Sequence, residues 1–275
     1  MRAPVLTLAD VVPGKQLDAL LRTLRPADTG AESTLVALAA HPRAGVRSTL
    51  AQRLPLMAHG AGGPALALVE AVVRLTSDEH PGVRESACFA LGTLWRDLPH
   101  PCVDDALAAR LDDEPEVRDE ALLGLAHRQD PRALPAVRRV LGEPVGLVSR
   151  LVLEAAGALG DTDLHPLVVA HAGDEDAWDA DDLDVVDAAV RLTDPAGLGD
   201  DVLDGVADLC RAGAAGRPPG RSVAAWEVLD GVLDVAPRRA RQALEAVAAR
   251  LVGEPEALVH LRERSALGVL AASCA

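Results

Sequence analysis

Hydrophobic positions recur at helical spacing from the first well-patterned stretch of the chain. In residues 14–25 the leucines at positions 17, 20, 21 and 24 lie three or four residues apart. That spacing places them on one face of a helix. The segment PADTG at 26–30 then interrupts the pattern. We therefore predict an N-terminal helix that caps whatever follows.

The apolar pattern then repeats with a fixed period. Residues 78–97 and 112–130 both read as an acidic cluster, a proline, any residue, Val-Arg, and then an alanine and a leucine at helical spacing. Leu91, Leu125 and Leu159 follow one another at intervals of 34 residues. A period in this range is typical of an array of helical repeats.

Each period predicts two helices joined by a corner. The corners contain Asp, Glu or Pro, which are favoured where helices begin. The predicted pairs are 31–40 with 46–58, 64–76 with 81–97, 101–111 with 115–128, 131–141 with 146–159, 163–173 with 181–193, 200–212 with 223–235, and 238–252 with 256–272. We expect an all-α fold of about six to seven helical hairpins. It would form one domain over 1–275, with a cap at 1–30, the clearest repeats at 31–160, and degenerate repeats and a C-terminal cap at 161–275.

The repeated residues resemble a known family. Pro-x-Val-Arg, Ala87-x-x-Ala90-Leu91-Gly92 and Ala155-x-x-Ala158-Leu159-Gly160 are similar to HEAT repeats, in particular the short type of phycobilisome-lyase-related proteins. The resemblance is strongest over 78–160 and implies an α-α superhelix, with the second helix of each pair on the concave side. Most such proteins are protein-binding scaffolds and a few are enzymes, so the resemblance implies a fold more than an activity.

The resemblance also implies a ladder of Asp–Arg pairs between adjacent repeats. Arginines at one repeat position would meet acids of the corners; the residues are Arg47, Arg84 and Arg118 with Asp78, Asp112 and Asp113. We interpret the ladder as structural. If its pairs are exposed, each is worth about 0–1 kcal/mol and mainly fixes the register of the repeats.

Three apolar residues occupy another repeat position on the second helices. Phe89, Leu123 and Leu153 align opposite the face that we expect to be buried. If exposed, they would form an apolar stripe that receives a helix or an extended peptide of a partner. The alternative is that they pack against the neighbouring repeat, and the sequence leaves both open.

Charge adds a second candidate site. The formal net charge is −15, and residues 174–210 hold 13 acidic residues against one arginine. The acidic segment 174–184, DEDAWDADDLD, places seven carboxylates around a tryptophan, which would suit an arginine-rich partner. A solvated loop that caps a helix is the alternative. The candidate residues are Asp176, Trp178, Asp179, Asp181 and Asp182.

Composition narrows the class of protein. Aromatic residues make up 1% of the chain, so the core must consist of Leu, Val and Ala. One lysine against 26 arginines is typical of a high-GC bacterial genome. No secretory signal, membrane-spanning run or CxxC pair occurs, so we expect a cytoplasmic protein without membrane association. Cys88 falls in a predicted helix, as a small core residue would.

No catalytic, metal-binding or cofactor-binding motif is present, because HExxH, GxSxG and phosphate-binding loops are missing. The negative charge disfavours nucleic acid as a partner, and with it a DNA glycosylase. We therefore predict a non-catalytic scaffold that binds a partner protein, suited to a basic one, through its concave groove or its acidic segment. The alternative is a small-molecule enzyme or lyase-like protein with inward polar residues such as His127, Asp130 or Glu154. Arg238, Arg239 and Arg241 are expected to form a solvated helical turn.

Overall fold

The computed structural model describes residues 14–24, 29–59, 62–144, 146–173, 175–218 and 222–273. These ranges contain helices and no strand, which confirms the all-α prediction. Most of the predicted break at 26–30 and the end of the predicted loop at 213–221 lie outside them. The chain divides into two compact units, unit 1 (residues 1–128) and unit 2 (residues 129–275).

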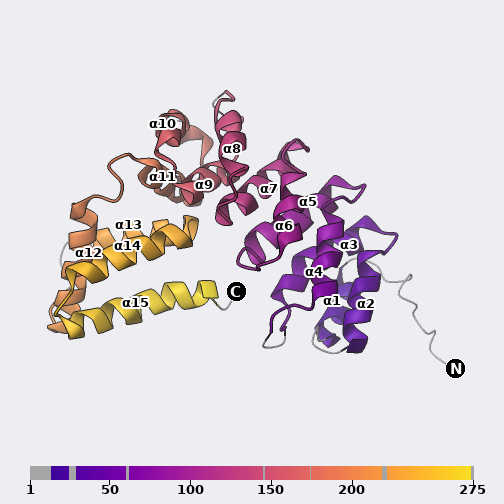
Figure 1. The fold of residues 1–275 in the computed structure, drawn as a ribbon, viewed down its shortest axis with the longest axis horizontal. Coiled ribbons are helices and arrows are strands. Elements are labelled where there is room, and N and C mark those ends of the chain that lie inside the picture. Colours follow the sequence, from indigo (N-terminus) through magenta and orange to yellow (C-terminus); the bar gives the residue numbers. More distant parts are fainter. Residues whose placement is uncertain are drawn as a thin grey trace. The chain divides into compact units, whose positions relative to one another are not determined.

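Unit 1 is a stack of three hairpins preceded by a capping helix. Its elements are α1 (Lys15–Thr23), α2 (Thr29–Ala39), α3 (Ala44–Arg53), η2 (Leu54–Leu56), α4 (Leu66–Leu75), α5 (Pro81–Phe89), η3 (Ala90–Leu94), α6 (Pro101–Ala108) and α7 (Pro115–His127). The first helices α2, α4 and α6 pack side by side in one layer, and the second helices α3, α5 and α7 form another (Figure 1). Leu50, Val83, Leu91 and Leu125 are fully buried among them, each contributing about 1.5–3 kcal/mol by removal from water.

The second layer of unit 1 is tightest where two glycines meet. A Cβ atom on Gly92 would lie 2.5 Å from the Cα of Gly124, and one on Gly124 would lie 2.6 Å from the Cα of Gly92. Gly92 lies in η3, a π-helical turn in which the Trp95 N–H donates to the Ala90 carbonyl at 2.8 Å. Gly92 and Gly124 therefore permit a close approach of the two helices.

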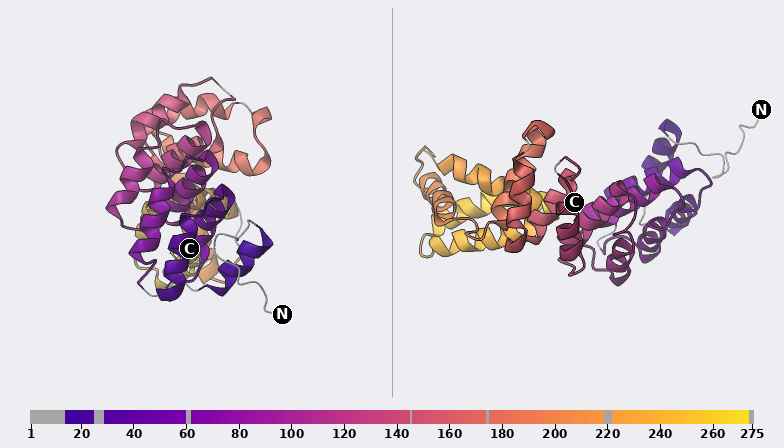
Figure 2. Two further views of the ribbon diagram at one scale, coloured as in Figure 1. Left: turned by 90° about the vertical axis from the view of Figure 1, so that its right-hand side faces the viewer. Right: turned by 90° about the horizontal axis from the view of Figure 1, so that it is seen from above.

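Unit 2 begins as a similar stack and departs from it at the end. Its elements are α8 (Ala133–Leu141), α9 (Arg150–Leu159), η4 (Thr162–Leu164), α10 (His165–Ala172), η5 (Glu175–Ala177), α11 (Ala180–Thr193), α12 (Asp200–Ala214), α13 (Ser222–Val235), α14 (Pro237–Arg250) and α15 (Pro255–Ser273). The second helices α9, α11 and α13 pack in sequence. In the last hairpin, however, α15 packs mainly on α12, and α14 packs on α13 (Figure 2). The helix pairs are those predicted, but this last pair is packed differently from a regular repeat.

The expectation of a solvated turn at 238–241 is wrong for Arg239. Its guanidinium donates to the carbonyls of Leu159 and Gly160 at 3.0 and 2.9 Å, and so caps the C-terminal end of α9. Gly160 adopts a left-handed conformation with φ of 59°. A Cβ there would lie 2.6 Å from Arg239 Nε, so the cap requires glycine. Arg238 and Arg241 are exposed, as predicted.

Cys88 is the small core residue that the sequence predicts. It is fully buried, and burial raises the pKa of its thiol to about 12, so it is a core residue rather than a nucleophile. Among the helices that the structure describes, none is both long and apolar enough to cross a bilayer.

Candidate functional site

Two rungs of the Asp–Arg ladder are present in unit 1. Arg47 donates from Nε and Nη2 to the two carboxylate oxygens of Asp78, both at 2.7 Å. Arg84 does the same to Asp113, at 3.0 and 2.7 Å. The third nitrogen of each arginine donates to a carbonyl of its own corner, that of His41 for Arg47. Each rung therefore joins one hairpin to the next.

These rungs are buried, and the expectation of weak exposed pairs is wrong for them. The side chains of Arg47 and Asp78 are 8% and 9% exposed, because the stacked second helices enclose the corner. Hydrogen bonds from Arg84 lower the pKa of Asp113. Burial works against ionisation of Asp78, but the Arg47 guanidinium and the His80 N–H outweigh it, and the pKa of Asp78 is also lowered. Both carboxylates are therefore held ionised.

The third predicted arginine has a partner within its own helix. Arg118 donates to Asp119 in its own helix at 2.8 Å, and Arg84 binds Asp113 rather than the adjacent Asp112. A pair that the sequence had not indicated occurs in unit 2, where Arg150 Nε lies 3.5 Å from Asp182. Arg150 and Asp182 are 32 residues apart in the sequence, and Arg47 and Asp78 are 31 residues apart. This similar spacing is the sequence signal that could have indicated the pair in unit 2.

The proposed apolar stripe is not exposed as a whole. Leu123 is 2% exposed and Leu153 is fully buried, whereas Phe89 is half-buried. The reason is that α7 packs against α5, η3 and α6, and α9 packs against α8, α11 and α13. A helix in the middle of such a stack is covered on several sides. Leu123 and Leu153 are core residues, and an exposed stripe through them is excluded.

Two acids of the acidic segment have structural roles. Asp179 caps α11, since its carboxylate accepts the N–H of Asp182 at 3.0 Å. Asp182 in turn faces Arg150 of α9. For these two residues the helix-capping and packing alternative accounts for the charge.

Four further acids of this segment have exposed side chains without an ion pair. Glu175, Asp176, Asp181 and Asp184 are exposed, and none forms an ion pair with a residue that the structure describes. They come from η5 and the first turns of α11. We call these four residues the acidic ridge.

Trp178 lies between η5 and α11, next to the acidic ridge in sequence. Its side chain is half-buried, and its indole Nε1 is shielded from solvent without a hydrogen-bond acceptor among the described residues. A buried tryptophan N–H usually finds a partner, and leaving it unsatisfied costs about 1–3 kcal/mol. The part of the Trp178 side chain that a partner can reach is therefore its exposed edge rather than this shielded N–H.

The second half of the acidic block differs from the first. On α12, Asp204 and Asp200 both pair with Arg250, the former at 2.7 Å. Asp208 pairs with Arg211 at 2.9 Å, and Arg211 also binds Glu254 at 3.0 Å. These three carboxylates are neutralised within the chain, unlike the four of the ridge.

The polar residues named for a small-molecule site have local partners instead. His127 is buried, and its Nδ1 lies 3.3 Å from the Gly92 carbonyl. Asp130 pairs with Arg132 at 2.7 Å, and Glu154 is half-buried on α9. Among the residues that the structure describes, no group of three or more His, Cys, Asp or Glu side chains could hold a metal ion.

We compared the chain with models of protein families, with curated proteins and with solved structures. A family model for HEAT repeats matches residues 104–183, and a second, for a single HEAT repeat, matches residues 68–98. No curated protein matches the chain. The X-ray structure of YibA from Escherichia coli is similar with 21% identity and a TM-score of 0.44, covering 68% of this chain and 72% of that one.

The matched segments contain the features that define the repeat physically. Residues 68–98 span α4, α5 and η3, with Arg84 of the ladder and Gly92 of the close helix approach. Residues 104–183 span the hairpins from α6 to the start of α11. These two segments of the chain are thus HEAT repeats.

Proposed function

We propose that this chain is a non-catalytic scaffold that binds a basic segment of a partner protein through the acidic ridge and Trp178. The observation that carries the proposal is the unpaired state of the four ridge carboxylates, whereas Asp200, Asp204 and Asp208 of the same acidic block pair with arginines. HEAT repeats suit such a role, because stacked hairpins present an extended surface.

The ridge concentrates negative charge over a short distance. Glu175, Asp176, Asp181 and Asp184 fall within ten residues of one another, on a chain whose net charge is −15. A surface of one sign attracts an oppositely charged partner and speeds its association. Exposed charges of this kind are screened at high salt, so binding through the ridge must depend on ionic strength.

Trp178 would add an aromatic contact to the charge attraction of the ridge. Tryptophan is enriched among the residues that dominate binding energy at protein interfaces. Its side chain is half-buried, so part of the indole remains exposed to a partner. An arginine side chain can also stack on the ring face. The proposal therefore favours arginine over lysine in the partner.

A pair of charge-matched variants tests the proposal. The ridge variant Asp176→Asn, Asp181→Asn, Asp184→Asn removes three unpaired charges. The control variant Asp200→Asn, Asp204→Asn, Asp208→Asn removes three charges that Arg250 and Arg211 already neutralise. Asp179 and Asp182 stay unchanged in both, since they cap and pair within the fold.

Binding of a fluorescent arginine-rich peptide is measured by anisotropy at about 50 mM salt. We expect the ridge variant to bind about tenfold more weakly than the wild-type chain, and the control variant to stay within about threefold of it. Equal losses in the two variants would show that net charge alone is responsible, and would contradict the proposal.

A further inference from the structure

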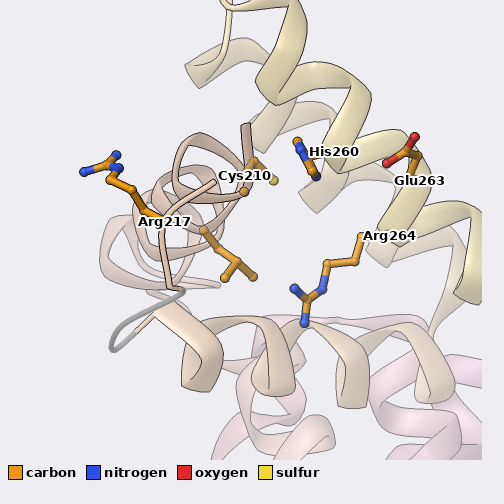
Figure 3. A pocket seen from close by; sticks show the side chains of 7 residues that line it. Cys210, Arg217, His260, Glu263 and Arg264 are labelled. Carbon is orange, nitrogen blue, oxygen red and sulfur yellow. The ribbon is translucent and has the colours of Figure 1, made fainter. Parts of the chain in front are cut away.

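Unit 2 contains a pocket between α12 and α15 that no motif indicated. Its volume is about 310 Å³, at the lower end of the range of small-molecule sites. The lining residues are Leu209, Cys210, Gly213, Arg217, His260, Glu263 and Arg264. Figure 3 shows the Cys210 sulfur turned toward the His260 ring, with the Arg264 guanidinium reaching in from α15 and Arg217 directed away.

Arg264 is held in place but its hydrogen-bond donors are unused. The guanidinium carbon lies 5.0 Å from the ring centre of Trp226, a buried residue of α13. Such stacking orients the charge without satisfying its N–H groups. Arg264 forms no ion pair with any residue that the structure describes. Arg211 and Arg250 in the same helical cluster each bind two carboxylates.

The carbonyl groups at the C-terminal end of α12 are not needed as acceptors for the Arg264 guanidinium. Its last carbonyls already accept backbone N–H groups, from Arg217 to Ala212 at 2.9 Å and from Gly216 to Gly213 at 3.0 Å. Gly216 adopts φ of 61°, the left-handed conformation that closes such a helix end. The donors of Arg264 therefore remain for a ligand.

The opposite wall is shaped by a glycine. A Cβ on Gly213 would lie 3.1 Å from His260 Nδ1, so the absence of a side chain lets the imidazole approach α12. Leu209 and the buried Cys210 provide apolar surface beside it. Burial raises the pKa of the Cys210 thiol, so this residue contributes a neutral wall rather than a nucleophile.

We propose that this pocket binds a small organic monoanion, a carboxylate that carries a short aliphatic tail. Arg264 and His260 would hold the carboxylate, while Leu209 and Cys210 would contact the tail. The formal charges of the lining residues Arg217, Glu263 and Arg264 sum to one positive charge. One charge matches a single carboxylate better than a polyphosphate. The site is separate from the acidic ridge and does not depend on the proposed partner.

The test uses hexanoate as the probe and the wild-type chain of 275 residues. Binding is followed by NMR through the imidazole Cε1–H signal of His260, which is assigned from its loss in His260→Gln. Hexan-1-ol has the tail without the charge, and inorganic phosphate has charge without the tail. We expect saturable shifts with hexanoate, at a dissociation constant of about 1 mM or below, and weaker binding of both comparators.

Two arginine variants separate the pocket from the general charge of α15. Arg264→Gln should weaken hexanoate binding at least about tenfold. Arg262→Gln makes the same charge change at an exposed residue outside the pocket and should leave binding within about twofold. Lack of saturation up to about 20 mM hexanoate, equal binding of hexan-1-ol, or equal binding by Arg264→Gln would each overturn the proposal.

Discussion

The Arg47–Asp78 ion pair is a case in which burial determines how much stability is lost when one partner is removed. Both side chains are enclosed at the junction of two hairpins, and Asp78 also accepts the His80 N–H at 3.0 Å. Removing one partner of such a pair leaves the other buried without a counter-charge. The rung is therefore costly to break, whatever its net contribution as an intact pair.

The substitution Asp78→Asn should lower the free energy of unfolding by about 3 kcal/mol, because it leaves the Arg47 charge buried and unpaired. Urea unfolding followed by circular dichroism measures this. The control is Asp163→Asn, which breaks the exposed pair with Arg138 at 3.5 Å and should change stability by less than about 0.5 kcal/mol. Equal effects of the two substitutions would contradict the burial argument.

The ladder also predicts a pH dependence. Arg84 lowers the pKa of Asp113, so the folded chain binds that proton less readily than the unfolded chain does. This contribution to stability is fully present above about pH 4, the pKa of an unperturbed Asp, and is lost as the pH falls through the lower folded pKa.

We expect the free energy of unfolding, measured in urea between about pH 2.5 and 6, to decrease less steeply on acidification in Asp113→Asn than in the wild-type chain. The substitution removes one of the groups that take up a proton on unfolding at low pH. Parallel curves for the two proteins would show that the Arg84–Asp113 rung does not contribute in this way.

At the scale of the elements, the second layer of unit 1 depends on the meeting of Gly92 and Gly124. No side chain fits between these backbones, because each Cβ would lie within 2.6 Å of the opposite Cα. The π-helical turn of η3 lies at the same crossing. The geometry of η3 is thus coupled to that of α7, through two glycines 32 residues apart.

Gly92→Ala should lower the free energy of unfolding by about 1–3 kcal/mol, since η3 and α7 must move apart to admit the methyl group. Gly231→Ala on α13 is the matched control. A Cβ there meets nothing within 4 Å, so the substitution should raise stability by about 0.5–1 kcal/mol through the better helix propensity of alanine. Chemical unfolding measures both, and a stable Gly92→Ala would contradict the close approach.

The elements themselves were predictable because their signals are local. Repeated apolar spacing and a proline at the corner place α5 and α7 correctly, and the period connects them. The cap of α9 was not predictable, because Arg239 lies 80 residues from Leu159 and nothing near it indicates that partner. The packing of α15 on α12 likewise depends on tertiary contacts rather than on a repeat signal.

At the scale of the whole molecule, the charge distribution matters more than the net charge of −15. The sequence shows one acidic block, whereas the structure divides it into a paired part on α12 and the unpaired acidic ridge. Composition could identify the block. It could not show the division, because Arg250 lies 46 residues from Asp204 and reaches it only in the folded chain.

The predicted apolar stripe is not exposed, and its burial too depends on tertiary contacts that the sequence does not show. A helical wheel places Leu123 opposite the expected buried face, but α7 is covered on more than one face by its neighbours. Periodicity within one helix reports an apolar stripe only when the other side meets water. Of the two predicted surfaces, the ridge is therefore the one on which the account depends.

The most direct test of the central claim is affinity capture from a lysate of the source organism, at about 50 and 500 mM salt, with quantitative mass spectrometry. Bait proteins are the wild-type chain, the ridge variant and the control variant. We predict a stoichiometric partner with an arginine-rich segment that the wild-type and control baits retain at low salt, and that the ridge variant and high salt both release. A partner retained equally by the ridge variant would contradict the claim that this chain binds through its acidic ridge.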